Sequence, residues 1–94
     1  MNTYTHISIR IIQYQEKIIG PLAWDIAAKV SGLVITNRKN PEVAITGDSK
    51  TVINDLVARY ELLWGDKLGK IECQDATNDL IKKMNLAEIP ESLR

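Results

Sequence analysis

The stretch SGLVITNRKNPEVAITGDS, residues 31–49, determines the fold class because it interrupts an otherwise helical pattern. Two β-branched runs, Leu33–Thr36 and Val43–Thr46, are separated by the polar residues 37–42. Short runs of this kind around turn-forming residues predict a β-hairpin. Pro41 stands at the turn or just before the second run, where a strand tolerates proline. We therefore expect a central two-stranded hairpin.

Residues 5–32, which precede the hairpin, show the three- and four-residue spacing of an amphipathic helix. The apolar positions with this spacing are Ile7, Ile11, Tyr14, Ile18 and Leu22. Gly20 and Pro21 interrupt the pattern, because proline lacks an amide donor and restricts the residue before it. One kinked helix or two helices would satisfy this pattern, and we favour two. Asp25 and Lys29 are spaced for an ion pair on the second helix.

Two more helices are predicted after the hairpin. Asp48 or Ser49 caps the first of them, and its apolar stripe consists of Val52, Ile53, Leu56, Val57, Tyr60, Leu63 and Trp64. The last helix follows Gly65 and runs to about Met84. We expect the tail, residues 85–94, to dock loosely or to fray. The predicted fold is α+β and mostly helical, in the order α-α-β-β-α-α.

Length and composition indicate one small globular domain spanning residues 1–94. The chain has 45% hydrophobic and 26% charged residues, and its 12 basic residues balance its 12 acidic ones. Residues 1–40 carry five basic and two acidic side chains, and residues 41–94 carry seven and ten. The two halves thus have opposite net charges. They can attract each other within one fold or between two copies, or they can be ordinary solvated surface.

The single cysteine, Cys73, excludes an internal disulfide and fits a reducing compartment. The sequence has no charged and apolar leader with a small-residue cleavage site. Its apolar runs fall far short of the 18 or so residues that indicate a membrane span. We therefore expect a cytoplasmic protein without a membrane partner.

No arrangement of residues predicts catalysis, a cofactor or a metal. The segment 45–51 superficially resembles a phosphate-binding loop, but Ala44 and Ser49 replace the two glycines which that loop requires. His6 is the only histidine, and it is far in sequence from Cys73, so no pair has metal-ligand spacing. Cys73 is expected to be a small buried residue, and the chain is expected not to be an enzyme.

The hairpin also predicts self-association. A hairpin of two short strands is marginal in water without further strands or helix packing. Two copies could join their hairpins edge to edge, or they could pack the isoleucine-rich faces of their first helices together. The competing interpretation is a monomer in which the helices cover the hairpin. The interface candidates are Ile7, Ile11, Trp24, Val34, Val43, Ile45 and Trp64.

Nucleic-acid binding is the alternative hypothesis. Arg38 and Lys39 form a basic hairpin tip after two helices, as in the wing of winged-helix proteins, and Lys29 is the one basic residue on the preceding helix. That helix offers few of the arginine, lysine or amide side chains that read bases. These three residues are therefore the nucleic-acid candidates of a small DNA-binding regulator.

Residues 18–23, Ile-Ile-Gly-Pro-Leu-Ala, and the apolar helix after them resemble an "IGP(I/L)A" helical segment. This segment occurs near the carboxyl ends of some bacterial signalling kinases and related regulatory proteins. The resemblance covers about residues 18–32 and implies a regulatory module, without assigning site residues. The sequence therefore favours a non-enzymatic regulatory or protein-interaction module that forms a homodimer and binds a further protein partner.

Overall fold

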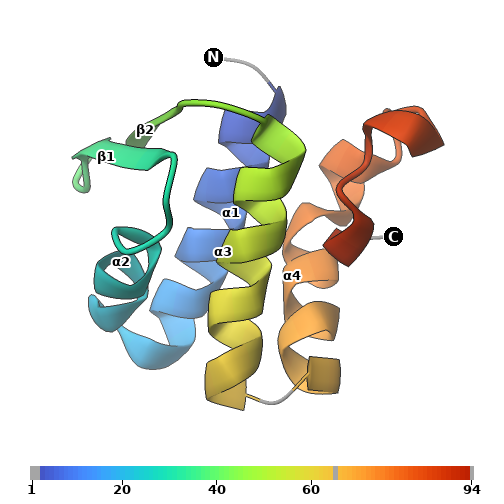
Figure 1. The fold of residues 1–94 in the computed structure, drawn as a ribbon. Coiled ribbons are helices and arrows are strands. Elements are labelled where there is room, and N and C mark those ends of the chain that lie inside the picture. Colours follow the sequence, from blue (N-terminus) through green and yellow to red (C-terminus); the bar gives the residue numbers. More distant parts are fainter. Residues whose placement is uncertain (1–2, 65, 94) are drawn as a thin grey trace.

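The computed structural model describes residues 3–64 and 66–93, with side chains for residues 3–63 and 73–93. Its elements are α1 (Thr3–Ile19), α2 (Leu22–Ala27), β1 (Leu33–Asn37), β2 (Glu42–Ile45), α3 (Ser49–Trp64), α4 (Asp66–Ile81) and the 3-10 helices η1 (Leu86–Glu88) and η2 (Glu91–Leu93). The long helices α1, α3 and α4 pack together, with α2 and the hairpin on one side and the tail on the other (Figure 1). This is the predicted α+β fold. No described helix is long and apolar enough to cross a membrane.

Gly20 ends α1 and turns the chain into α2. Its φ of 68° lies in the left-handed region that glycine tolerates, and its amide still donates to the Glu16 carbonyl at 2.8 Å. Pro21 caps α2, at a position where its missing N–H is not needed. The predicted boundary at Gly20 and Pro21 is confirmed, and two helices meet there.

The second helix is shorter than predicted. After Ala27 the backbone tightens into three-residue turns, such as the 3.0 Å bond from the Val30 amide to the Ala27 carbonyl. The expected Asp25–Lys29 pair is replaced by an ion pair between Asp25 and Arg38 at 3.0 Å. The helix ends before Lys29 completes the required turn, so this side chain is not placed over Asp25.

The core lies where α1, α2 and α3 meet. The buried Tyr60 hydroxyl on α3 donates to the Ala23 carbonyl on α2 at 2.9 Å, and the Trp24 indole N–H donates to the Glu16 carboxylate at 2.6 Å. Both aromatic side chains are therefore buried with their polar groups satisfied. The fully or almost fully buried apolar side chains include Ile7, Ile11, Ile12, Ala23, Trp24, Ala27, Ile53, Leu56, Val57 and Tyr60.

The apolar stripe of α3 is confirmed except at its C-terminal end. Val52 and Tyr60, together with the residues between them that the pattern selected, are buried. Leu63 was expected in the core, but it is 46% exposed, and the neighbouring Leu62 is 84% exposed. The last turn of α3 extends beyond the corner between α1 and α2, so the core does not reach it (Figure 1).

Asp48 is the N-cap of α3, as expected. Its Oδ2 atom accepts hydrogen bonds from the Thr51 amide at 3.0 Å and the Thr51 hydroxyl at 2.6 Å. These bonds hold the pKa of the Asp48 carboxyl below its ordinary value. The loop that superficially resembled a phosphate site therefore directs a carboxylate at its own helix terminus.

The tail packs on the helices, where loose docking or fraying was expected. Ile89 and Leu93 are buried, and η2 packs on α3 and α4. The Asn54 side-chain oxygen on α3 accepts bonds from the Ser92 amide at 3.0 Å and the Ser92 hydroxyl at 2.7 Å. Two short 3-10 turns bring these groups together, and helical periodicity does not reveal such turns.

We expect Leu56→Ala to lower the free energy of unfolding by about 2–5 kcal/mol, because it empties a fully buried site. Leu62→Ala is the matched control on the same helix and should change stability by no more than about 0.5 kcal/mol. Urea denaturation measures both. Equal losses in the two variants would mean that α3 is oriented differently.

Candidate protein-interaction site

One face of the hairpin packs on the core, and the other faces solvent. The core-facing residues are Leu33, Ile35, Val43 and Ile45, which are buried or half-buried. Val34 and Ala44 lie opposite each other in the antiparallel register and are both exposed. The alternation of buried and exposed side chains follows the two-residue period of a strand.

The hydrogen bonds of the hairpin determine which backbone groups of β1 point outward. The Thr46 amide donates to the Gly32 carbonyl at 2.8 Å, so this pair is hydrogen-bonded. Antiparallel pairs alternate, so Val34 also bonds to β2, whereas Ile35 and Val43 form a non-hydrogen-bonded pair. The N–H and C=O of Ile35 therefore point away from β2, toward the outer edge of β1.

The two sides of the hairpin are not equivalent. β2 packs against α1, and its first residue is the charged Glu42, directly after Pro41. Charged residues and proline are common devices that protect a strand edge. β1 has β2 as its only substantial neighbour among the described elements, and residues 33–37 include neither a charge nor a proline. A register shift between Ile35 and Asn37 interrupts the regular pairing near the end of β1.

A groove of about 460 Å³ runs along β1. It is lined by Ala28, Leu33, Val34, Ile35, Thr36, Asn37 and Arg38. All of these residues except Ala28 belong to β1 or directly follow it, so the groove lies beside the strand. The small side chain of Ala28 leaves room for the side chains of another segment. We call Ile35, the exposed Val34 and Thr36, and this groove the β1 edge site.

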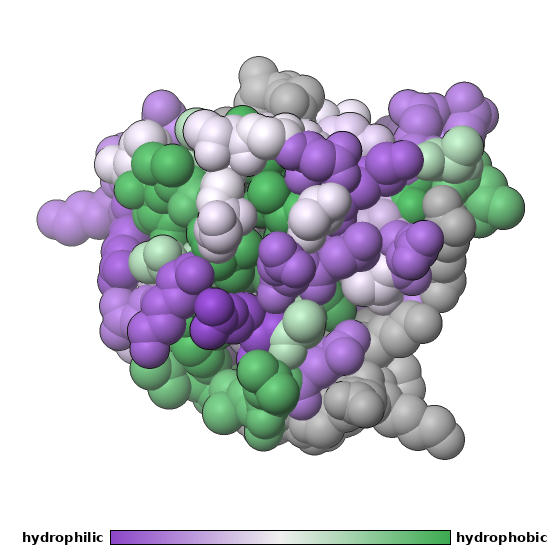
Figure 2. All heavy atoms as spheres, in the orientation of Figure 1, coloured by the Kyte–Doolittle hydropathy of each residue, from purple (hydrophilic) through white to green (hydrophobic). Residues whose placement is uncertain are grey.

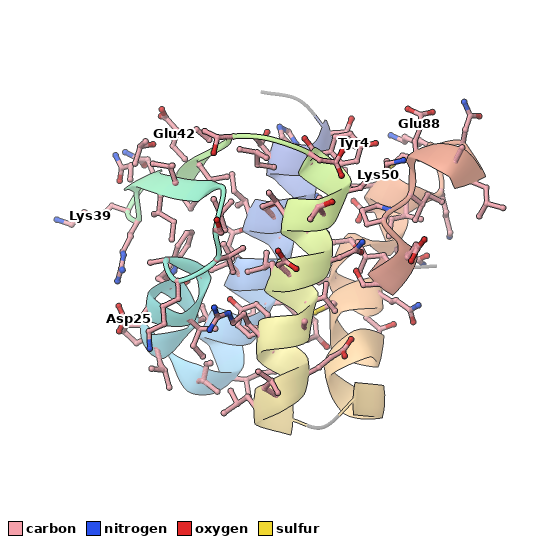
Figure 3. The ribbon with its side chains drawn as sticks, in the orientation of Figure 1. Tyr4, Asp25, Lys39, Glu42, Lys50 and Glu88 are labelled. Atoms are coloured by element: carbon pink, nitrogen blue, oxygen red, sulfur yellow. The ribbon has the colours of Figure 1, made fainter. Side chains whose placement is uncertain are left out.

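The basic residues near the hairpin do not form a free cationic surface. Arg38 Nη1 lies 3.0 Å from the Asp25 carboxylate, so the charge of Arg38 is balanced within the chain. Lys29 and Lys39 are exposed, and Lys39 projects from the hairpin tip (Figure 3). The exposed ion pair between Arg38 and Asp25 contributes at most about 1 kcal/mol of stability, but it reduces the positive charge at the hairpin.

Four of the predicted interface residues are core residues instead, which corrects that expectation. Ile7 and Ile11 are 0% exposed, Trp24 is 1% exposed and Val43 is 5% exposed. The isoleucine-rich face of α1 packs on the other helices of its own chain. A helix-to-helix dimer through this face would require the core to open.

The remaining interface candidates have different positions. Val34 is 47% exposed on the outer face of β1, and Ile45 is half-buried on the inner face of β2. The side chain of Trp64 lies outside the described residues. The sequence reasoning missed Ile35 and Ala28. The absence of charge and proline from β1, in contrast to Pro41 and Glu42 beside β2, was the available indication.

A second apolar surface lies at the far end of the molecule. Its exposed side chains are Ile18, Leu22, Leu62 and Leu63. Hydrophobic atoms lie both at the hairpin and along the lower end of the molecule (Figure 2). This lower surface is formed by helices. It therefore offers no unpaired strand edge to which an extended segment could hydrogen-bond.

Within the described part of the chain, titratable and nucleophilic side chains do not gather into a further site. Among the described residues, no group of three or more histidine, cysteine, aspartate or glutamate side chains could hold a metal ion. His6 is exposed, and Cys73 is buried. Burial raises the pKa of the Tyr60 hydroxyl, which therefore stays protonated as a donor to Ala23.

Comparison of the chain with protein-family models, curated proteins and solved structures gave no match. We therefore infer a function from the geometry of the β1 edge site.

Cys73 should react slowly with a thiol reagent in the native protein and rapidly in denaturant, because its side chain is fully buried. Labelling with and without urea, followed by mass spectrometry, measures both rates. Cys73→Ala removes the thiol and serves as the blank. Rapid labelling of the native protein would contradict the buried position.

Proposed function

We propose that the chain is a non-enzymatic protein-interaction module that binds an extended segment of a protein along β1. The observation that carries this proposal is the open edge of β1, where the outward backbone groups of Ile35 border a groove. An extended segment that adds to such an edge gains main-chain hydrogen bonds, and its alternate side chains enter the neighbouring groove.

The groove fits such a ligand in chemistry as well as in shape. Leu33 and Ile35 give its floor apolar character, and Ala28 widens it. Side chains on one face of an added strand would lie over this floor. Apolar residues at alternate positions of the partner segment are therefore preferred.

The sequence suggests where the module acts and what kind of role it has. We place the module in the cytoplasm, where a reducing environment keeps Cys73 as a thiol. The resemblance of residues 18–32 to a segment of bacterial signalling proteins supports a regulatory role. A regulatory module can act by binding a protein segment without catalysing a reaction on that segment.

DNA binding through Lys29, Arg38 and Lys39 stays the alternative prediction. The Arg38–Asp25 ion pair favours it less than protein binding, because a phosphate contact would compete with Asp25. A mobility shift that weakens steeply with salt would support this alternative.

Binding is tested with a matched pair of variants at Ile35. Ile35→Pro removes the outward N–H without breaking a hydrogen bond within the hairpin. Ile35→Ala loses more side-chain packing but keeps that N–H. We expect proteins captured by the wild-type chain from an extract of its source organism to be captured more weakly by Ile35→Ala, which keeps the N–H but narrows the apolar floor, and to be lost with Ile35→Pro.

Circular dichroism of both variants checks that they are folded. If folded Ile35→Pro captures the same proteins as the wild type, the β1 edge is not the binding site.

A further inference from the structure

We propose that a segment which pairs with β1 is the β1 strand of a second copy of this chain. The two hairpins then form one four-stranded antiparallel sheet, in the order β2-β1-β1-β2, around a two-fold axis. This inference rests on the proposed function, because it assigns a partner to the same β1 edge site.

The register of this pairing follows from the direction of the backbone groups. Ile35 is the central residue of β1, and its N–H and C=O point outward. A two-fold axis beside Ile35 lets the Ile35 residues of the two copies exchange two hydrogen bonds. In this register Val34 of one copy lies opposite Thr36 of the other, the residue at which the pairing of β1 with β2 shifts.

The strand is chemically suited to pair with itself. Val34 and Thr36 are β-branched and exposed, and such residues pack well across neighbouring strands. No charged residue lies within residues 33–37, so the pairing opposes no like charges. The charges of Arg38 and Lys39 lie beyond the paired segment. The two Ile35 side chains would lie on the inner face of the joined sheet. There they would extend the apolar floor of the groove near Ala28.

A second copy also explains why assembly would stop at two chains. β2 packs against α1, so each hairpin offers its β1 side for pairing. A two-fold arrangement consumes both β1 edges and closes the assembly. The edge that invites open-ended aggregation in a single chain is covered in the dimer.

The expected dimer is weak. The chain has an accessible surface of 5432 Å², and a standard interface of about 800 Å² per partner would cover roughly 15% of it. Pairing of a five-residue strand covers less than that. We therefore expect the dimer to have a dissociation constant in the micromolar range or above.

Sedimentation velocity from about 5 to 500 μM tests the association over the range that a weak dimer requires. We expect concentration-dependent dimers for the wild type, weaker dimers for Ile35→Ala, which keeps the N–H but loses part of the apolar floor, and monomers for folded Ile35→Pro. Val34→Lys/Thr36→Lys is a second monomeric variant, because it puts four lysines on the joined sheet. Both positions are exposed, and the change removes one hairpin bond, from the Thr36 hydroxyl to the Glu42 carbonyl at 3.0 Å. A wild type that stays monomeric overturns the proposal, as does a dimer that survives in both blocking variants.

Cross-linking tests the register. In a Cys73→Ala background, Val34→Cys and Thr36→Cys are made as separate proteins. Non-hydrogen-bonded partners lie about 4.5 Å apart between Cα atoms, within the range that a disulfide spans. Mild oxidation of the mixture should give a disulfide-linked dimer, and either protein alone should give much less. Equal cross-linking in all three samples overturns the register.

The result is separable from the test of the proposed function. A monomeric wild type whose captured proteins are still lost in Ile35→Pro would refute the self-pairing and leave the β1 edge as a site for another protein.

Discussion

The buried hydrogen bond from the Tyr60 hydroxyl to the Ala23 carbonyl fixes the short helix α2 against α3. Six residues are too few for a helix to be stable alone, so α2 depends on this contact and on the burial of Ala23, Trp24 and Ala27. The hairpin begins six residues after α2 ends. The position of β1 therefore depends on where α2 is held.

The placement of the hairpin makes its two sides unequal. The β2 side faces α1, and the β1 side faces the groove beside Ala28. A two-stranded sheet always has two outer edges. Among the described elements, α1 packs against β2 and not against the outer edge of β1. The unequal packing links the fold to the proposed interaction, because the backbone groups of Ile35 are left as the chemistry available to a partner.

The order of elements, the boundary at Gly20 and the Asp48 cap could be predicted from the sequence, because each depends on local spacing and backbone chemistry. The spacing of apolar residues could not show that Ile7, Ile11 and Trp24 are buried within the chain and are not at an interface. Periodicity shows that a face is apolar, but it does not show whether the same chain covers it. Docking of the tail escaped prediction because Asn54 and Ser92 are distant in sequence. The openness of β1 likewise depends on tertiary packing.

The proposed interactions all require that the outer edge of β1 is open in a single chain. Amide hydrogen exchange by NMR on the monomeric Val34→Lys/Thr36→Lys variant can detect this open edge, because the neighbouring amides of residues 34 and 35 point in opposite directions. We predict slow exchange at position 34, whose amide bonds to β2, and fast exchange at Ile35. Slow exchange at both positions in this monomer would show that the edge is covered within the chain.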